Sequence, residues 1–249
     1  MLMSVIERQF DFVDFSEFSG ARVLITGLTS QSGFELARAF ADHGARLVIQ
    51  SPEDSPEMTE LAAVLAENAA AMKFFNDPLV SDDEAVRLVQ SAVQEFGGVD
   101  VAINLVSVSP RAMARLETLE DVEGLVHDAL RIPLRLTEVA ANRMRLVWIE
   151  GSILNVVRMP EAAGGRAMMV ADVLRAELQE LTRALATQWA EHGVRINAVG
   201  PPSSVAVLGG RSAGSDADVA ALALQAASRK ARSVSGYVLD AEGVAQRWC

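Results

Sequence analysis

The chain has 249 residues, half of them hydrophobic, and a formal net charge of −11. This length is typical of one α/β domain or two small ones, and the acidic balance argues against nucleic acid or a membrane surface as a partner, because both require a basic face. The sequence has no apolar run of about 18 residues that could span a membrane. Its one cysteine, Cys249, excludes an internal disulfide, so a cytoplasmic protein is expected.

Residues 1–19 are expected to form an extension ahead of the first strand. This segment carries more aromatic side chains than a free tail would, at Phe10, Phe12, Phe15 and Phe18. It is expected to pack as an arm on its own domain or to reach a partner subunit. Acidic residues within the apolar stretch and the lack of a small-residue cleavage site argue against a secretory signal.

Strand and helix patterns alternate along the rest of the chain. Apolar, β-branched segments predict strands at 21–26, 45–50, 72–75, 99–106, 152–157, 194–199 and 236–240. Apolar residues at helical spacing predict helices at 32–44, 58–69, 81–96, 118–143 and 167–192. Ser81 and Glu84 form a capping box at the start of the third helix. The Gly- and Ser-rich segment 201–218 is expected to be a loop.

This alternation predicts the fold class. A strand, a turn, a helix and a second strand within about 30 residues form a right-handed unit of a parallel sheet. No linker or solenoid repeat interrupts residues 20–249, so a single domain is expected there. The sequence therefore predicts an α/β protein with a single Rossmann-like, doubly wound parallel sheet of about seven strands and helices on both faces.

Several short motifs follow one another at fixed places in this pattern. Thr26-Gly27 and Gly33 follow the first strand, Asn104 ends the fourth, and the long helix contains LTRALA before the strand motif RINAVGP. In this order and spacing the chain resembles the short-chain dehydrogenase/reductase family over residues 19–243. The resemblance implies a dinucleotide-binding fold and is weaker grounds for an activity.

The same resemblance implies that the catalytic residues of that family are missing. Alignment through the long helix places Ala171 at the catalytic tyrosine and Arg175 at the lysine. The strand SILNVV ends at Arg158, thirteen positions before Ala171, where the serine would stand, and Ala129 falls at the asparagine. Alanine has no proton to give, and arginine stays protonated at any useful pH. No catalytic residue is therefore predicted.

A second alignment of the serine strand is open. The run LVWIE at 146–150 would then form the strand and leave Ser152 in the serine role. This alternative needs about six extra residues before the helix, so the first alignment is preferred. Both leave no tyrosine near Ala171, because the one tyrosine of the chain is Tyr237.

The first turn of the fold retains part of the phosphate-binding motif of the family. The family pattern TGxxxGxG is matched at Gly27 and Gly33, whereas Gln31 replaces the middle glycine. An amide side chain at that position would fill part of the space in which a phosphate approaches the backbone. The two remaining glycines either bind a dinucleotide or serve only the turn and the packing of helix on strand.

Recognition of the nucleoside is reduced as well. The second strand ends in Gln50-Ser51, without the acidic residue that holds the ribose of NAD or an arginine for the 2′-phosphate of NADP. Asn104 is retained but is expected to tie strand ends together, and Pro202 replaces a glycine beside the nicotinamide. We therefore expect no cofactor, and NAD(P) bound at Gly27, Gly33, Ser51 and Asn104 is the less favoured alternative. No metal site is expected.

Other polar groups near the lost positions are weighed in the same way. The acids Asp172, Glu150 and Glu161 have no evident base partner, and the histidines His43, His127 and His192 fall at helix ends or outer faces. Arg158 and Arg175 form a small cationic pocket for an anion or are paired within the chain.

The surfaces through which this family assembles are retained. Two long helices, at 118–143 and 167–192, would pair across a two-fold axis, and the last strand would meet its counterpart. The candidate interface residues are Ala176, Ala184, Trp189, Gly236 and Tyr237. The chain is expected to form a homo-oligomer or a hetero-oligomer, with a tetramer expected, beside an active member of the family.

These features predict a catalytically silent homologue of short-chain dehydrogenases that serves as a structural or regulatory subunit. Two alternatives are kept. The chain is an NAD(P)-dependent oxidoreductase with an atypical active site, or it is a sensor of nucleotides or acyl compounds.

Overall fold

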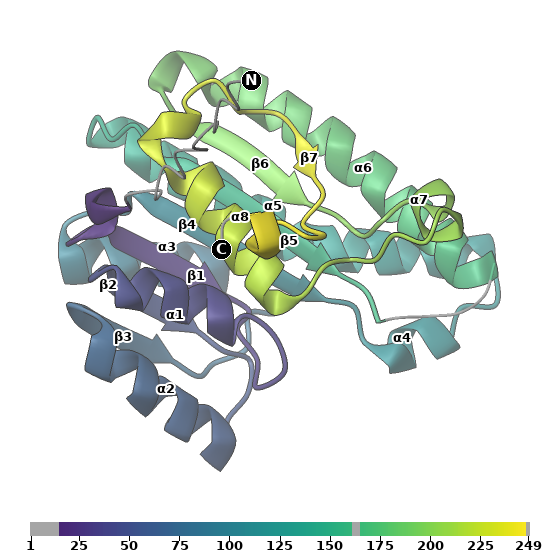
Figure 1. Cartoon of the computed structure of the whole chain (residues 1–249), viewed down its shortest axis with the longest axis horizontal. Coiled ribbons are helices and arrows are strands. Elements are labelled where there is room, and N and C mark those ends of the chain that lie inside the picture. The colour runs from purple at the N-terminus through teal and green to yellow at the C-terminus, as the bar shows by residue number, and fades with distance from the viewer. Residues whose placement is uncertain (1–14, 161–164, 248–249) are drawn as a thin grey trace, which may run out of the picture.

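A seven-stranded parallel sheet forms the centre of the computed structural model, which describes residues 15–160 and 165–247 (Figure 1). The strand order is β3-β2-β1-β4-β5-β6-β7, and each neighbouring pair is parallel. The strands are β1 (Arg22–Thr26), β2 (Arg46–Gln50), β3 (Ala71–Phe75), β4 (Val101–Ser107), β5 (Ser152–Arg158), β6 (Arg195–Val199) and β7 (Val238–Leu239). This arrangement confirms the predicted doubly wound fold.

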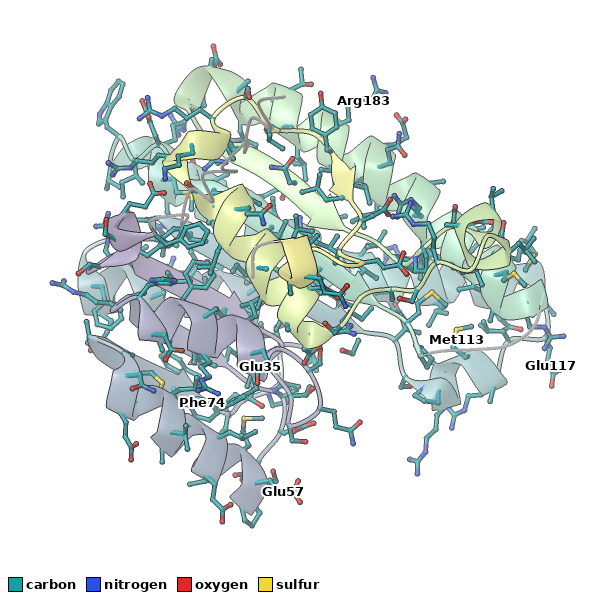
Figure 2. All side chains as sticks on the ribbon, in the orientation of Figure 1. Glu35, Glu57, Phe74, Met113, Glu117 and Arg183 are labelled. Carbon is teal, nitrogen blue, oxygen red and sulfur yellow. The ribbon has the colours of Figure 1, made fainter. Side chains whose placement is uncertain are left out.

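Helices cover both faces of the sheet (Figure 1). One face carries α1 (Phe34–Asp42), α2 (Pro56–Asn68) and α8 (Asp216–Ala227), and the other carries α3 (Asp82–Phe96), α5 (Leu119–Leu146) and α6 (Gly165–Trp189). Two short helices, α4 (Pro110–Ala114) and α7 (Ser204–Leu208), follow the ends of β4 and β6. Charged side chains such as Glu57 of α2 and Arg183 of α6 lie on the outer faces of the helices (Figure 2).

The central strands are continuous apolar runs because both of their faces are covered. In β1 the side chains from Val23 to Ile25 are buried, and those of β4 and β5 are buried along almost their whole length. Phe40 of α1 is fully buried beneath the sheet. Helices begin where capping residues predict, since Ser81 and Glu84 form the expected capping box at α3.

The structure decides between the two alignments of the serine strand. The strand β5 is Ser152–Arg158, whereas 146–150 forms the end of α5 and the turn after it. The amides of Trp148 and Ile149 donate to the carbonyls of Arg145 and Met144, which closes the helix instead of pairing with the sheet. The alternative with Ser152 in the serine role is therefore wrong.

Two helices lie where the sequence predicts a loop. The segment 201–218 contains α7 and the start of α8. The helix α8 has no apolar stripe to reveal it, because apolar or small side chains cover nearly all of its sides and most of them are buried. A helix buried on many sides cannot be recognised by the period of its apolar residues.

The described part of the N-terminal arm packs on its own domain. A short 3-10 helix (Ser16–Phe18) places the ring of Phe18 at 5.1 Å from that of Phe40 and the ring of Phe15 at 5.4 Å from that of His43. Residues 1–14, which include Phe10 and Phe12, lie outside the described residues. Among the described helices, none is both long and apolar enough to cross a membrane.

Candidate active site

The strand order reverses between β1 and β4, and a cavity opens at their carboxyl ends. Its volume is about 260 Å³, and its lining includes Gly27, Gln50, Leu105, Asp128 and Ala129. In open parallel sheets ligands bind outside the carboxyl ends of the strands at such a reversal. The turn between β1 and α1 contributes Gly27 and Thr29 to the wall of this cavity, so the first glycine of the motif lies at the expected place.

Close packing explains why Gly27 and Gly33 must be glycines. Both have positive φ angles, of 75° and 93°. A Cβ atom on Gly27 would overlap the carbonyl oxygen of Leu105 in β4, and one on Gly33 would overlap the side chain of the same leucine. The structural role considered for these glycines is therefore real, because a side chain at either position would collide with Leu105.

Three amides of this turn hold oxygen acceptors from distant side chains. The amide of Gly27 donates to Gln50 Oε1 at 2.9 Å, and the amide of Ser30 donates to Glu53 Oε2 at 2.8 Å. The amide of Gly33 donates to Asp216 Oδ2 at 3.3 Å. Gln31, which replaces the middle glycine of the motif, is exposed, and none of these three acceptors belongs to it.

Ser51 does not lie where a ribose could reach it. Its side chain is fully buried, accepts a hydrogen bond from the amide of Glu53 at 3.0 Å and donates to the carbonyl of the same residue at 3.4 Å. Ser51 therefore shapes the loop after β2, which corrects its assignment as a nucleoside-binding residue. The loop instead directs Glu53, which the sequence analysis overlooked, toward the first turn.

Asn104 joins strand ends in the buried centre. Its Nδ2 donates to Asn155 Oδ1 at 2.8 Å and to Thr137 Oγ1 at 3.3 Å, and its Oδ1 accepts from Thr26 Oγ1 at 3.1 Å. These bonds connect β1, β4, β5 and α5. With an exposed fraction of 1%, Asn104 holds the floor of the cavity in place.

Arg158 ends β5 at the position aligned with the catalytic serine. Its guanidinium forms an ion pair with Asp216, the first residue of α8, and donates to the carbonyl of Gly214 at 3.2 Å. Burial lowers the pKa of Arg158 from its ordinary value, but arginine remains protonated near neutral pH. Arg158 is therefore a fixed cation that cannot serve as a base.

Arg175 and Ala171 lie on the inner side of α6. Arg175 pairs with Asp240 at 2.8 Å and donates to the carbonyl of Pro201 at 2.9 Å. The side chain of Ala171 is buried. Since both Arg158 and Arg175 have carboxylate partners in the chain, the structure favours internal pairing over a free cationic pocket.

The alternative acids are not arranged for proton transfer. Asp172 accepts a hydrogen bond from the amide of Ser204 at 2.8 Å and thereby attaches α7 to α6. Glu150 lies at the opposite edge of the sheet, and Glu161 lies outside the described residues. His43 packs on the N-terminal arm, whereas His127 is exposed on α5.

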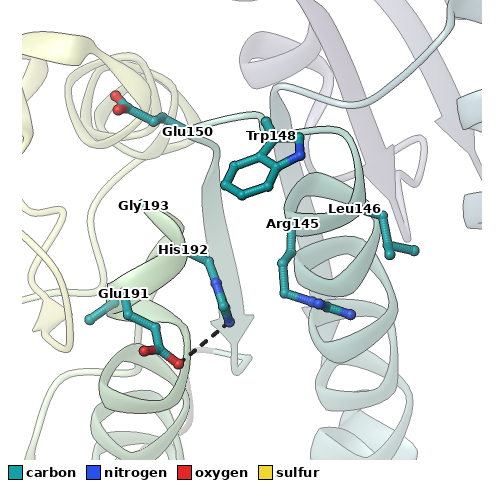
Figure 3. A pocket seen from close by; sticks show the side chains of 8 residues that line it. Arg145, Leu146, Trp148, Glu150, Glu191, His192 and Gly193 are labelled. Atoms are coloured by element: carbon teal, nitrogen blue, oxygen red, sulfur yellow. Dashed lines mark ion pairs between the residues drawn. The ribbon is translucent and has the colours of Figure 1, made fainter.

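A second depression, of about 550 Å³, lies beyond the amino ends of the strands, between the ends of α5 and α6 (Figure 3). It contains His192 and Glu191, whose side chains approach to 3.6 Å. Trp148, beside them, is 94% exposed and has a φ angle of 55°, which is rare for a bulky residue. This depression is far from the ligand edge of the fold, so its residues have no part in the site at β1 and β4.

The candidate interface residues fall into two groups. Ala176 and Ala184 on α6 and Tyr237 before β7 are exposed, and Gly236 is half-buried. Trp189 is 8% exposed and packs in the core of its own chain, which corrects its assignment as an interface anchor. Trp189 lies on the same face of α6 as the buried Leu178 and Leu185, so its side chain points into the core.

The fold and the glycine turn at the strand reversal define a Rossmann-type dinucleotide-binding scaffold. A family model described as enoyl-(acyl carrier protein) reductase matches residues 27–205. An oxidoreductase of Thermotoga maritima is 32% identical over 186 residues, which are 74% of this chain and 72% of that protein. The chain therefore belongs to the short-chain dehydrogenase/reductase family, a family of oxidoreductases.

Two further relatives bear on the cofactor. Galactitol 2-dehydrogenase of Agrobacterium fabrum is 28% identical over 178 residues, which are 72% of this chain and 68% of that protein. The crystal structure of the NADH-dependent reductase A1-R′ complexed with NAD covers 93% of this chain and 99% of its own, with a TM-score of 0.75 and 24% identity. These findings contradict the prediction that no cofactor is used.

The prediction failed because it judged the first turn by its side chains. Phosphate oxygens bind the backbone amides at the start of α1, and these amides are present whichever residue replaces the middle glycine. The amides of Gly27, Ser30 and Gly33 each donate to a side-chain oxygen, two of them to a carboxylate, so this turn offers amide donors that can bind an anion. The donor set of this turn therefore fits a dinucleotide.

Proposed function

We propose that this chain is a non-catalytic, dinucleotide-binding member of the short-chain dehydrogenase/reductase family, and that it works as a subunit beside an active member of that family. In this proposal residues 20–249 form a single domain that supplies a scaffold and a nucleotide site. Proton transfer takes place in the partner.

The observation that supports catalytic silence is the set of side chains around the end of β5 and the first half of α6. Proton transfer at a carbinol oxygen requires a group of matched pKa within hydrogen-bond reach. Ala171 offers no such group, and the guanidiniums of Arg158 and Arg175 are engaged by Asp216 and Asp240. The chain therefore has permanent cations where its family has a hydroxyl and an amine.

A nicotinamide dinucleotide supplies hydride transfer when it is bound. In this chain the amide of Gly33, ahead of α1, would hold a phosphate, and the network of Asn104 keeps the strand ends fixed. These residues bind and orient the dinucleotide and move no proton. Binding then stabilises the folded subunit, because a ligand that binds only the native state raises the free energy of unfolding.

Exposed apolar side chains support the role in assembly. Trp148, at the end of α5, is 94% exposed and lies next to Leu146 and Val147, which are 53% and 48% exposed. A tryptophan at this exposure is typical of an anchor that a partner covers. Ala176 and Ala184 are exposed small residues on α6, at the helix that is expected to pair with a partner.

The test is purification of the tagged chain from its own cells, followed by sequencing of any chain that elutes with it. We expect a stoichiometric second chain that carries the tyrosine and lysine of the family. Trp148→Ser or Ala184→Arg should release it, whereas Val64→Arg, at an exposed site on α2, should not. The proposal would be contradicted if the wild type eluted without a second chain, as a monomer or a homo-oligomer, and oxidised alcohols by itself.

A second candidate is an oxidoreductase with an atypical site. It is favoured by the names of the relatives, and by Asp128 and Ser107, which line the cavity next to Ala129. In this alternative Asp128 would have to take the place of the missing tyrosine. Turnover that is lost in Asp128→Asn would support it.

A further inference from the structure

One carboxylate links three elements that are far apart in the sequence. Asp216 is the first residue of α8, and its Oδ1 pairs with Arg158 at the end of β5. Its Oδ2 accepts from the amide of Gly33, the N-cap residue of α1, 183 positions away. The carboxylate therefore lies at the amino end of α1, the helix that follows the turn at the cavity between β1 and β4.

Charge explains why this position is favourable for Asp216. The amino end of α1 carries a partial positive charge and unpaired amides, so an anion is stabilised there. A dinucleotide places its pyrophosphate at the same helix end in folds of this type. Two anions cannot share the Gly33 amide, because one hydrogen is available and like charges repel at this distance.

We infer that Asp216 is a built-in competitor for the phosphate site, so that a dinucleotide binds this chain only by displacing the Asp216 carboxylate from Gly33. This inference rests on the dinucleotide binding proposed above. Arg158 acts as a positioning residue, because its guanidinium holds the carboxylate in front of the helix. The cation that replaced the family's serine therefore gains a role in ligand binding.

Displacement also has a structural consequence for α8. Asp216 stands in the first turn of α8, next to the N-cap Ser215 and its capping partner Asp218. The Arg158 guanidinium further holds the carbonyl of Gly214. A carboxylate that leaves Gly33 therefore loosens the start of α8, so dinucleotide binding is coupled to this segment.

The test is calorimetric titration of the full chain with NAD and with ADP-ribose, in the wild type and in Asp216→Ala. Asp82→Ala is the matched control, because Asp82 is also the first residue of a capping-box helix and also pairs with an arginine, Arg131. Circular dichroism first establishes that all three chains are folded. Adenosine, which carries no phosphate, is the ligand control.

Asp216→Ala should bind both phosphate-bearing ligands about tenfold more tightly or better, because removal of one charge-assisted competitor is worth at least this factor. Asp82→Ala should match the wild type, and the affinity for adenosine should be unchanged. Amide exchange at 214–218 should rise when NAD is added to the wild type.

Equal affinities of the wild type and Asp216→Ala, or equal tightening for adenosine, would overturn the inference while leaving dinucleotide binding intact. A failure of both chains to bind NAD would overturn the inference together with the proposed nucleotide site. Neither result depends on turnover, so the proposed catalytic silence is tested separately.

Discussion

Arg175 of α6 lies 2.8 Å from Asp240, which follows β7. The same guanidinium donates to the carbonyl of Pro201 after β6. Arg175 therefore fastens the long helix to the ends of two strands.

Replacement of Arg175 by Met should lower the free energy of unfolding by about 1–2 kcal/mol, because one half-buried ion pair and one hydrogen bond to a carbonyl are lost. For a chain of this size that corresponds to a fall in Tm of roughly 2–8 °C. Arg38→Met, which removes an exposed pair with Asp42, should cost less than about 0.5 kcal/mol. Equal losses in the two variants would contradict this assignment.

The pair of Arg22 and Asp100 predicts a dependence of stability on pH. Burial opposes ionisation of Asp100, but hydrogen bonds and charge from Arg22 outweigh it and hold the pKa of Asp100 below its ordinary value. The stabilisation is therefore complete above the unfolded pKa of about 4 and is lost as the pH falls through the folded pKa.

Urea unfolding of the wild type and Asp100→Asn checks this sign. The wild type should be more stable at pH 7, and the difference should shrink as the pH is lowered below about 4. If the difference in unfolding free energy stayed constant or grew on acidification, ionised Asp100 would not stabilise the folded chain.

Substitution of Gly27 and of Gly20 by alanine distinguishes the cost of backbone conformation from the cost of close packing. Their φ angles are nearly equal, 75° and 74°, but a Cβ on Gly27 meets Leu105 and a Cβ on Gly20 meets open space. Gly20→Ala should therefore cost about 1–2 kcal/mol for conformation alone. Gly27→Ala should cost more than about 3 kcal/mol or prevent folding, since an overlap with a backbone carbonyl cannot be relieved by a side-chain rotation. Similar unfolding midpoints of the two variants would contradict the packing argument.

Glu53 is expected to set the preference between dinucleotides. Its carboxylate lies 2.8 Å from the amide of Ser30, and it stands twenty positions after Gly33, the interval at which an acid binds the ribose of NAD in such folds. A 2′-phosphate would be repelled there. Glu53→Gln should lower the ratio of the Kd for NADP to the Kd for NAD about tenfold. Glu57→Gln on α2 should leave this ratio unchanged. An unaltered ratio in Glu53→Gln would remove Glu53 from this role.

The seven strands of the sheet and five of the helices followed from the sequence because their signals are local. Apolar runs mark β1 and β4, and Ser81 with Glu84 marks the start of α3. The helix α8 was missed because most of its sides are buried, which removes the helical stripe of apolar residues.

The site was harder to predict because its contacts join distant residues. Arg158 and Asp216 are 58 positions apart, and no pattern in the sequence connects them. Ser51 was assigned because it directly follows β2, and Glu53 was not considered, yet the loop buries Ser51 and turns Glu53 toward Ser30. The cofactor prediction failed for another reason, since it relied on side chains, whereas backbone amides such as that of Gly33 are donors whichever side chains surround them.

The central claim is that this chain moves no proton of its own, and turnover tests it most directly. The purified single chain is incubated with NAD(H) or NADP(H) and a panel of alcohols and ketones, and absorbance at the nicotinamide band is followed. We expect no rate above that of the buffer, both in the wild type and in Asp128→Asn. A wild-type kcat near the common enzyme value of about 10 s⁻¹ would contradict the account.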